Sequence, residues 1–358
     1  IRGALQHAVQ RRVDPEHMYK WLHRIWYEGG SLYWLLLPLS GLYWLLIGAR
    51  RALYRIGVFG SHRPDAPVIV VGNITAGGTG KTPVTIWLAR ELRDRGFVPG
   101  IVSRGYGGSR SGTSMRVDAA SDPAVVGDEP VLIARRTGCP VVVDADRVRA
   151  AQMLVAEGVN VIIADDGLQH YRLERTYEIC VIDGARGLGN RLLLPAGPLR
   201  ETIDRLCDVD QVLINGSLDG DAGNLTTVEQ NAIEFRLAAN EVSRLNGSLT
   251  RPIERFSGTT VHGVAAIGNP RRFFDMLRGH GMQVIEHAYR DHSRLGRNEL
   301  EYGDDFDVLM TEKDAVKLDR STSDKFWTVP VELEIEPVVA GPWIEQVESR
   351  LRSELEAA

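Results

Sequence analysis

Residues 71–83, VGNITAGGTGKTP, combine the residue types that hold a nucleotide phosphate. The glycines let the backbone turn its N–H groups inward where a helix begins, and an anion is favoured there. Lys81 adds a cation that can reach the β and γ phosphates, and the Thr82 hydroxyl is placed to ligate Mg²⁺. The alternative is a tight strand-to-helix turn with an incidental lysine. The flanking strand and helix favour a nucleotide-binding P-loop, made by Thr75, Ala76, Gly77, Gly78, Thr79, Gly80, Lys81 and Thr82.

Two pairs of adjacent carboxylates follow the loop along the chain. Asp165 and Asp166 end the apolar run VIIADDG, which is the position from which a P-loop enzyme orients Mg²⁺. The alternative there is an ordinary Asp-Gly turn at a strand end. Asp128 and Glu129 begin a helix, where the helix dipole favours negative charge, so alone they are also consistent with helix capping. The loop and the first pair together predict a nucleotide site with a metal ion.

The elements that must position these side chains alternate along the chain. Short runs rich in Val and Ile are separated by helical stretches that begin near Thr82, Asp128 and Arg147. Such a pattern predicts an α/β fold of the P-loop NTPase type, with a parallel sheet covered by helices on both faces. Ligands of these sheets lie beyond the carboxyl ends of the strands. The expected strands lie within residues 68–73, 100–104, 139–146, 159–167, 178–184 and 209–216.

The chain of 358 residues is long enough for two domains. The polar stretch GSLDGDAGN, residues 216–224, is typical of a linker, and a second strand-helix-strand pattern follows it. We therefore expect an N-terminal membrane-associated helical segment, a P-loop core and a smaller C-terminal α/β domain. Their predicted ranges are 1–62, 63–216 and 217–358.

Residues 31–49, SLYWLLLPLSGLYWLLIGA, carry no charge and are followed by Arg50, Arg51 and Arg55. Their length is at the lower limit for a membrane span, and Pro38 would interrupt a longer helix. We expect a segment that lies in the membrane interface rather than one that crosses the bilayer. A buried core helix is the alternative.

Composition narrows the class of protein further. The net charge is −5, and residues 1–65 carry nine Lys and Arg against four Asp and Glu, so the N-terminal end is the basic one. Three cysteines stand apart without a C-x-x-C pair, as expected of a reducing compartment. Basic residues are not interleaved with aromatic ones outside the apolar segment, so nucleic acid is not an expected partner. Nothing in the sequence indicates an obligate protein partner.

Eight motifs follow the apolar segment or adjoin it in a fixed order: VGNITAGGTGKTP, SRGYGG, VGDEP, ADDGLQH, LLPAGPLRE, GNP, DH and TEKD. Together they resemble the tetraacyldisaccharide 4′-kinase family of lipid A biosynthesis, from about residue 20 to about residue 320. The resemblance implies phosphoryl transfer from ATP to the 4′-hydroxyl of a tetraacylated glucosamine disaccharide 1-phosphate. It also implies a location at the cytoplasmic face of the inner membrane, with the membrane surface as a partner.

The resemblance also assigns roles to individual residues. An Asp and a His act as a catalytic pair in this family, and the matching positions are Asp128 and His292. Asp128 would accept the hydroxyl proton, and His292 would orient or relay it. The residues expected to bind the metal ion directly or through water are Thr82, Glu129, Asp165 and Asp166. The residues expected to bind phosphate groups of the substrate or the nucleotide are Arg104, Arg147, His170 and Arg200.

Two other functions share some of these features. A membrane-recruited P-loop ATPase of the partitioning or metal-delivery type would have the loop and the aspartates but no lipid acceptor. A GTPase switch usually selects guanine with an N-K-x-D element, and TEKD has different spacing.

Overall fold

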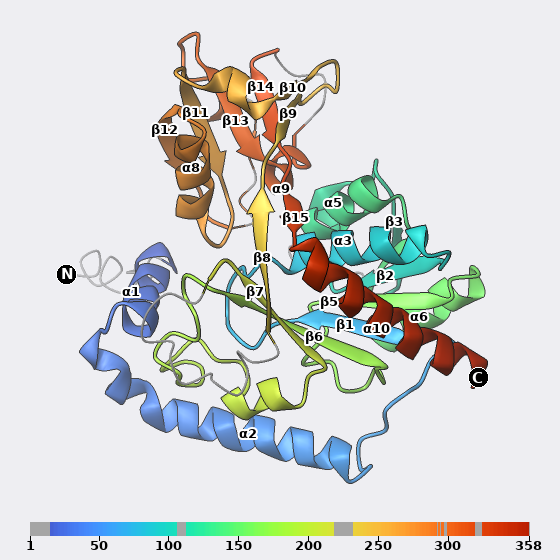
Figure 1. The fold of residues 1–358 in the computed structure, drawn as a ribbon. Helices are drawn as coiled ribbons and strands as arrows, with labels where there is room; N and C mark the ends of the chain where they lie inside the picture. The colour runs from blue at the N-terminus through green and yellow to red at the C-terminus, as the bar shows by residue number, and fades with distance from the viewer. Residues whose placement is uncertain are drawn as a thin grey trace, which may run out of the picture.

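A nine-stranded sheet forms the lower half of the molecule in the computed structural model (Figure 1). Its strand order is β15-β8-β7-β6-β1-β5-β2-β4-β3. The strands from β8 to β4 run parallel, and β3 and β15 pair antiparallel at the two edges. The structure describes residues 15–105, 112–217, 232–291, 293, 295–296, 299–318 and 324–357.

Central strand β1 (Val68–Gly72) lies between β5 (Val161–Asp165) and β6 (Tyr177–Asp183), and all three are fully buried. Side chains alternate across a strand, so Ile69 and Val71 enter one apolar core while Val68 and Val70 enter another. Two buried faces explain why these runs are almost continuously apolar. The other strands of this sheet are β2 (Pro99–Ser103), β3 (Met115–Val117), β4 (Val141–Val143), β7 (Gln211–Asn215), β8 (Ala232–Ala238) and β15 (Glu332–Glu334).

Helices cover both faces of this sheet, as expected for the predicted α/β class. Residues of α3 (Lys81–Asp94) and α5 (Asp128–Thr137) belong to one core, and those of α6 (Arg147–Ala156) belong to the other. The fold class predicted from the sequence is confirmed, and the three helices begin within one residue of the expected positions.

A second sheet stands above the first and has six strands, in the order β10-β9-β14-β13-β11-β12 (Figure 1). Its own core includes Phe274, Leu309 and Trp327. The elements of this part are β9 (Glu241–Arg244), β10 (Thr250–Pro252), η3 (Ile253–Phe256), β11 (Thr260–Ala265), α8 (Pro270–Gly279), β12 (Gln283–Ala288), β13 (Asp307–Thr311), α9 (Glu312–Ala315) and β14 (Phe326–Val329).

The boundary predicted at residue 217 needs correction, because the chain returns to the first sheet. β8 continues the parallel order beyond β7, and β15 pairs antiparallel with β8. Helix α10 (Pro337–Glu356) then packs Trp343, Ile344, Val347 and Leu351 into the core beside α3. We call residues 239–331 the upper lobe and the part built on the nine-stranded sheet the core lobe. The upper lobe is an insertion between two neighbouring strands of the core lobe.

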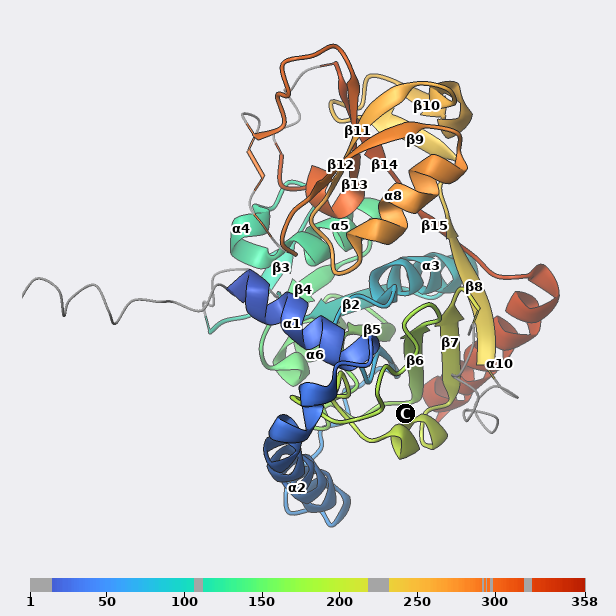
Figure 2. The ribbon, with the colours of Figure 1, turned by 90° about the vertical axis from the view of Figure 1, so that its left-hand side faces the viewer.

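The N-terminal segment comprises α1 (Pro15–Tyr27), η1 (Ser31–Leu36) and α2 (Leu37–Arg55). Figures 1 and 2 both place α2 along the base of the core lobe, on the side away from the upper lobe. Pro38 stands in the first turn of α2, where its missing N–H costs nothing, so it starts the helix rather than breaking it. Residues 31–55 are long and apolar enough to cross a membrane, and only 6% of their most apolar window is buried.

Candidate functional site

The predicted P-loop lies at the carboxyl end of β1 and runs directly into α3. Gly77 and Gly80 have φ of 107° and 100°, a backbone region that favours glycine. Asn73 Nδ2 donates a hydrogen bond to the Thr75 carbonyl at 2.8 Å and so fixes the turn from inside. Because α3 begins at Lys81, its first N–H groups face the loop and favour an anion.

Residues of both lobes contact this loop. From the core lobe, Asn215 Nδ2 at the end of β7 donates to the Thr79 carbonyl at 3.2 Å. From the upper lobe, Arg272 donates to Asn215 Oδ1 at 2.6 Å and holds that amide in place. A Cβ atom on Gly268 would lie 2.9 Å from the Gly78 nitrogen, so only glycine lets the upper lobe approach this closely. The phosphate site is therefore formed at the junction of the lobes.

The two aspartates at the end of β5 face the loop lysine. Lys81 Nζ lies 3.6 Å from Asp166 Oδ1, and the Arg200 guanidinium lies 3.2 Å from the same oxygen. Asp165 is buried and accepts a hydrogen bond from Thr85 Oγ1 at 3.2 Å. Asp166 has φ of 50°, an uncommon left-handed conformation for a residue with a side chain. This turn directs two successive carboxylates into one site.

The surroundings shift the pKa values of Asp165 and Asp166 in opposite directions. Burial raises the pKa of Asp165 to about 7, and the neighbouring charges of Glu129 and Asp166 add to the effect. Burial acts in the same direction on Asp166, but Lys81 and Arg200 lower its pKa below the usual value. The site thus holds two neighbouring carboxylates away from bulk water, and their oxygen donors suit Mg²⁺. Within the described residues no three His, Cys, Asp or Glu side chains form a complete metal site, so an ion here needs further oxygens from a nucleotide.

Replacing Asp165 with asparagine is expected to stabilise the protein in the absence of Mg²⁺ and nucleotide. The folded protein holds the Asp165 proton to a pH near 7, whereas the ordinary value is 3.8, so stability falls as pH rises through this range. Asparagine has no such titration. Thermal unfolding at pH 8 with a chelator should show a higher Tm, by about 2–4 °C for each kcal/mol of relieved penalty.

The difference in Tm between Asp165→Asn and the wild type should shrink as the pH is lowered from 8 towards 5. Exposed Asp65 supplies the matched control, because Asp65→Asn should leave Tm unchanged at both pH values. A Tm for Asp165→Asn below that of the wild type at pH 8 would contradict the burial argument.

A group of basic side chains borders the aspartates. Arg147 is buried, and its Nε atom has no hydrogen-bond partner. Burial lowers the pKa of Arg147, and the nearby Arg104 charge adds to the effect, although Asp166 and Asp165 oppose it. Burial and the Arg147 charge lower the pKa of His170 to about 4, so this ring is neutral at physiological pH. Its buried Nε2 atom also lacks a partner, which suits a site that receives a polar ligand.

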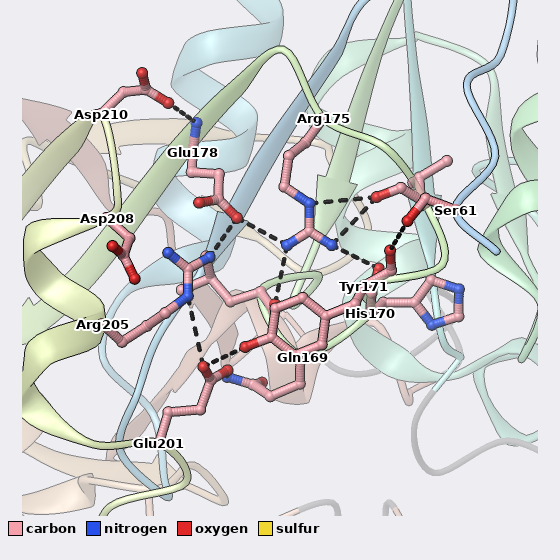
Figure 3. Close-up of polar contacts among 12 residues, drawn as sticks. Ser61, Gln169, His170, Tyr171, Arg175, Glu178, Glu201, Arg205, Asp208 and Asp210 are labelled. Atoms are coloured by element: carbon pink, nitrogen blue, oxygen red, sulfur yellow. Dashed lines mark hydrogen bonds and ion pairs between the residues drawn. The ribbon is translucent and has the colours of Figure 1, made fainter. Parts of the chain in front are cut away.

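Arg175 and two buried carboxylates form a hydrogen-bond network around His170 (Figure 3). Arg175 donates to the His170 carbonyl at 2.7 Å and to Glu178 at 2.7 Å. Tyr171 donates to Glu201 at 2.5 Å, and Gln169 donates to the same carboxylate at 2.9 Å. Burial, with the Glu201 charge, raises the pKa of Tyr171 to about 12, so its hydroxyl remains a donor. Glu201 directly follows Arg200, so one network fixes both the ADDGLQH turn and the arginine on Asp166.

An ionic cluster joins the start of α5 to the upper lobe. Lys313 of the TEKD motif lies 2.9 Å from Glu129 Oε1 and 2.9 Å from Asp291 Oδ1. Burial lowers the pKa of Lys313, but the charges of Glu129 and Asp291 outweigh it and raise the pKa above the usual value. Lys317 Nζ lies 3.5 Å from the buried carboxylate of Asp128. Three motifs that are far apart in the sequence therefore meet here.

The structure brings the predicted site residues of both carboxylate pairs, the P-loop and the basic group together beyond the carboxyl ends of the parallel strands. His292 lies outside the described residues, although its neighbour Asp291 is in the cluster. Lys313 and Asn73 were not assigned from the sequence. Their signals were only their places inside TEKD and VGNITAGGTGKTP, since nothing local shows which oxygen a lysine or amide will reach.

Comparison with known proteins gives one consistent result. Residues 32–349 match the family model described as tetraacyldisaccharide-1-P 4′-kinase. The tetraacyldisaccharide 4′-kinase of Nitrosococcus oceani is 47% identical over 313 residues, which are 87% of this chain and 90% of that protein. That of Alkalilimnicola ehrlichii is 51% identical over 300 residues, or 84% and 88%. A solved structure of LpxK from Aquifex aeolicus in complex with ATP has a TM-score of 0.72 at 25% identity, covering 91% of this chain and 100% of that chain.

Proposed function

This chain belongs to the tetraacyldisaccharide-1-P 4′-kinase family, and from that premise we propose how its site performs the reaction. The activity is transfer of the γ-phosphoryl group of ATP to the 4′-hydroxyl of a tetraacylated glucosamine disaccharide 1-phosphate. The observation that carries the proposal is the position of Lys81, 3.6 Å from Asp166, at the end of a glycine loop that both lobes enclose. ATP phosphates would lie on this loop, with the lipid hydroxyl entering from the junction of the lobes.

The transition state of phosphoryl transfer needs alignment and charge neutralisation more than covalent help. Lys81 would face the β and γ phosphates, and the N–H groups from Gly77 to Thr82 would surround them. Arg200 holds Asp166 at 3.2 Å, which keeps that carboxylate turned towards the loop. In this arrangement the protein supplies fixed positive charge where the transferred group passes.

The residues that would supply some of the oxygen ligands of Mg²⁺ are Thr82, Asp165, Asp166 and Glu129, and the nucleotide phosphates would supply the others. When bound, it would neutralise phosphate charge during transfer. The raised pKa of Asp165 supports this assignment, because a divalent cation would relieve the cost of two neighbouring buried carboxylates.

Asp128 is our candidate for the base that accepts the 4′-hydroxyl proton, with His292 as its partner. The buried Asp128 carboxylate starts α5 at the lobe junction, where an acceptor hydroxyl could reach it. Lys317 Nζ lies 3.5 Å from this carboxylate and 2.8 Å from Asp314 Oδ1, so the lysine is held between two acidic side chains beside the proposed base.

Arg104, Arg147, His170 and Arg200 are our candidates for phosphate oxygens of the substrate or nucleotide. The unpartnered nitrogens of Arg147 and His170 support this role, since a buried donor without an acceptor is costly until a ligand supplies one. A guanidinium fork also matches phosphate geometry.

We place the protein at the cytoplasmic face of the inner membrane, held by one face of the N-terminal segment. Trp34, Trp44, Leu45 and Leu46 are each more than half exposed, which water disfavours but an acyl boundary accepts. Arg51 and Arg55 at the end of α2 instead pair with Asp208 of the core lobe, so apolar burial is the main support for this position. The helix lies along the core lobe instead of leaving it, which supports a position in the interface rather than across the bilayer.

Binding to vesicles is expected to survive high salt. At about 1 M NaCl the Debye length is about 3 Å, which screens headgroup attraction but leaves apolar burial intact. Sedimentation of the full chain with anionic vesicles should therefore retain most of the protein. The Trp34→Ser/Trp44→Ser variant should be released, while Val338→Ser on α10, a control at an exposed apolar position, should behave as wild type. Complete release of the wild type by salt alone would rule out apolar insertion.

The activity itself is tested by incubating the protein with ATP, Mg²⁺ and a tetraacyl disaccharide 1-phosphate. A bisphosphorylated lipid is the expected product, detected by mass spectrometry. ATP hydrolysis with no phosphorylated lipid would instead indicate the ATPase alternative.

A further inference from the structure

Two polar side chains of α2 contact the core lobe. Ser40 Oγ donates to the Leu193 carbonyl at 2.9 Å and accepts from the Ala196 amide at 3.0 Å. The Tyr43 hydroxyl, one turn further along the helix, donates to the Arg200 carbonyl at 2.9 Å. Ser40 is the only residue of α2 that is buried. The polar side of α2 thus contacts backbone groups that span one short segment.

That segment, residues 193–200, is called the bridging segment here, and its opposite side contacts the P-loop. Ala76 N–H donates to the Pro198 carbonyl at 2.8 Å, and Arg200 N–H donates to the Ile74 carbonyl at 2.7 Å. The segment forms only isolated β-bridges and no helix or strand. Internal hydrogen bonds, such as that from Leu194 N–H to the Leu199 carbonyl, shape the turn, and the contacts with α2 and the phosphate loop fix its position between them.

Arg200 extends the connection to the aspartates. Its carbonyl accepts the hydrogen bond from Tyr43, and its guanidinium lies 3.2 Å from Asp166, the partner of Lys81. A shift of α2 relative to the core lobe would therefore change the backbone at Arg200. That shift would reach both the start of the P-loop and the carboxylate opposite its lysine.

We propose that Ser40 and Tyr43 are positioning residues that couple the seating of α2 on a lipid surface to the order of the phosphate-binding loop. This inference rests on the proposed membrane position of α2. With its apolar side in lipid, the helix presents Ser40 and Tyr43 to the bridging segment, which then supports residues 74–76. By linkage, nucleotide and membrane each raise the affinity of the protein for the other by the same factor.

Vesicle affinity with and without nucleotide tests the coupling. The full chain is titrated with vesicles of phosphatidylethanolamine and phosphatidylglycerol, alone and with Mg²⁺ and a non-hydrolysable ATP analogue. We expect the analogue to tighten vesicle binding of the wild type by about 5-fold. In the Ser40→Ala/Tyr43→Phe variant the factor should fall to near unity, while vesicle affinity without nucleotide stays close to wild type because the apolar face is intact.

Tyr33 provides the matched control. It lies in η1 on the same N-terminal segment, and its side chain is 41% exposed. Tyr33→Phe removes the same oxygen atom from a tyrosine away from the bridging segment. The coupling factor of this variant should equal that of the wild type.

Nucleotide affinity in detergent solution gives a second measure that needs neither vesicles nor catalysis. Tyr43→Phe removes one hydrogen bond and should raise the dissociation constant of the analogue by up to about 5-fold, with Tm close to wild type. Tyr33→Phe should leave it unchanged. A structural loss unrelated to the loop would instead lower Tm without this selective effect on nucleotide.

The inference is overturned if the analogue tightens vesicle binding of the double variant as much as that of the wild type. It is also overturned if Tyr43→Phe binds the analogue in detergent as tightly as Tyr33→Phe does. A wild-type protein that does not bind vesicles would refute the membrane position under Proposed function. In that case the comparison in detergent still decides whether Tyr43 positions the loop.

Discussion

Replacing Lys81 with alanine is expected to lower kcat by at least about 10²–10³ fold, the usual cost of losing one charge-stabilising donor. The Lys81 ammonium is the cation of the P-loop that lies nearest the aspartates, 3.6 Å from Asp166. Without Lys81, the charge that develops on the phosphoryl oxygens has no counterion on the loop. Asp166, which faces the phosphates, would then be neutralised by Arg200 alone. ATP binding should weaken as well, because the same cation contacts the ground-state phosphates.

The measurement is formation of the bisphosphorylated lipid at saturating ATP and Mg²⁺. Lys325→Ala is a suitable control, since Lys325 pairs with Asp305 in the upper lobe, 2.7 Å away. That variant should keep wild-type turnover. Near-normal turnover of Lys81→Ala would refute the P-loop assignment.

Asp128→Asn is expected to lower kcat by about 10²–10⁴ fold, the range typical of general-base assistance, with KM for ATP nearly unchanged. The hydroxyl proton is not part of nucleotide binding, so the loss should fall on the chemical step. The fold should survive, because Lys317 keeps its contact with Asp314 at 2.8 Å when the Asp128 charge is removed.

Two comparisons separate a base from a metal ligand. Excess Mg²⁺ should partly restore Asp165→Asn but should not restore Asp128→Asn. If Asp128 and His292 serve one proton transfer, their double variant should be hardly worse than the worse single variant. The assigned roles would be contradicted if the two losses in kcat multiplied in the double variant. They would also be contradicted if Mg²⁺ restored the kcat of Asp128→Asn.

The sequence predicted most of the core lobe because its signals are local. Runs such as Val68–Gly72 are apolar throughout since both of their faces are buried, and the glycines around Lys81 are required by the backbone of the turn. The α/β class and the gathering of motifs at the carboxyl ends of the strands follow from those two facts.

The return of the chain to the first sheet could not be predicted in the same way. β15 has only three residues, and nothing in Glu332–Glu334 indicates that its partner is β8, almost a hundred residues earlier. The apolar residues of α10 indicate a buried helix face but not which core it covers. The contacts of Lys313 also depend on how the lobes pack, because each of its partners belongs to a distant motif.

Helix α10 completes the core lobe last, because it is the last helix to be synthesised. Its Trp343 stacks on Trp87 of α3 with ring centroids 5.4 Å apart, and Trp343 Nε1 donates to the Tyr177 hydroxyl at 3.3 Å. Residues 337–356 leave the ribosome only after the entire upper lobe has been made, so the apolar surface around Trp87 waits uncovered for that interval. The nascent core lobe therefore exposes apolar surface while the upper lobe is being made, and such surface makes a folding intermediate prone to aggregate.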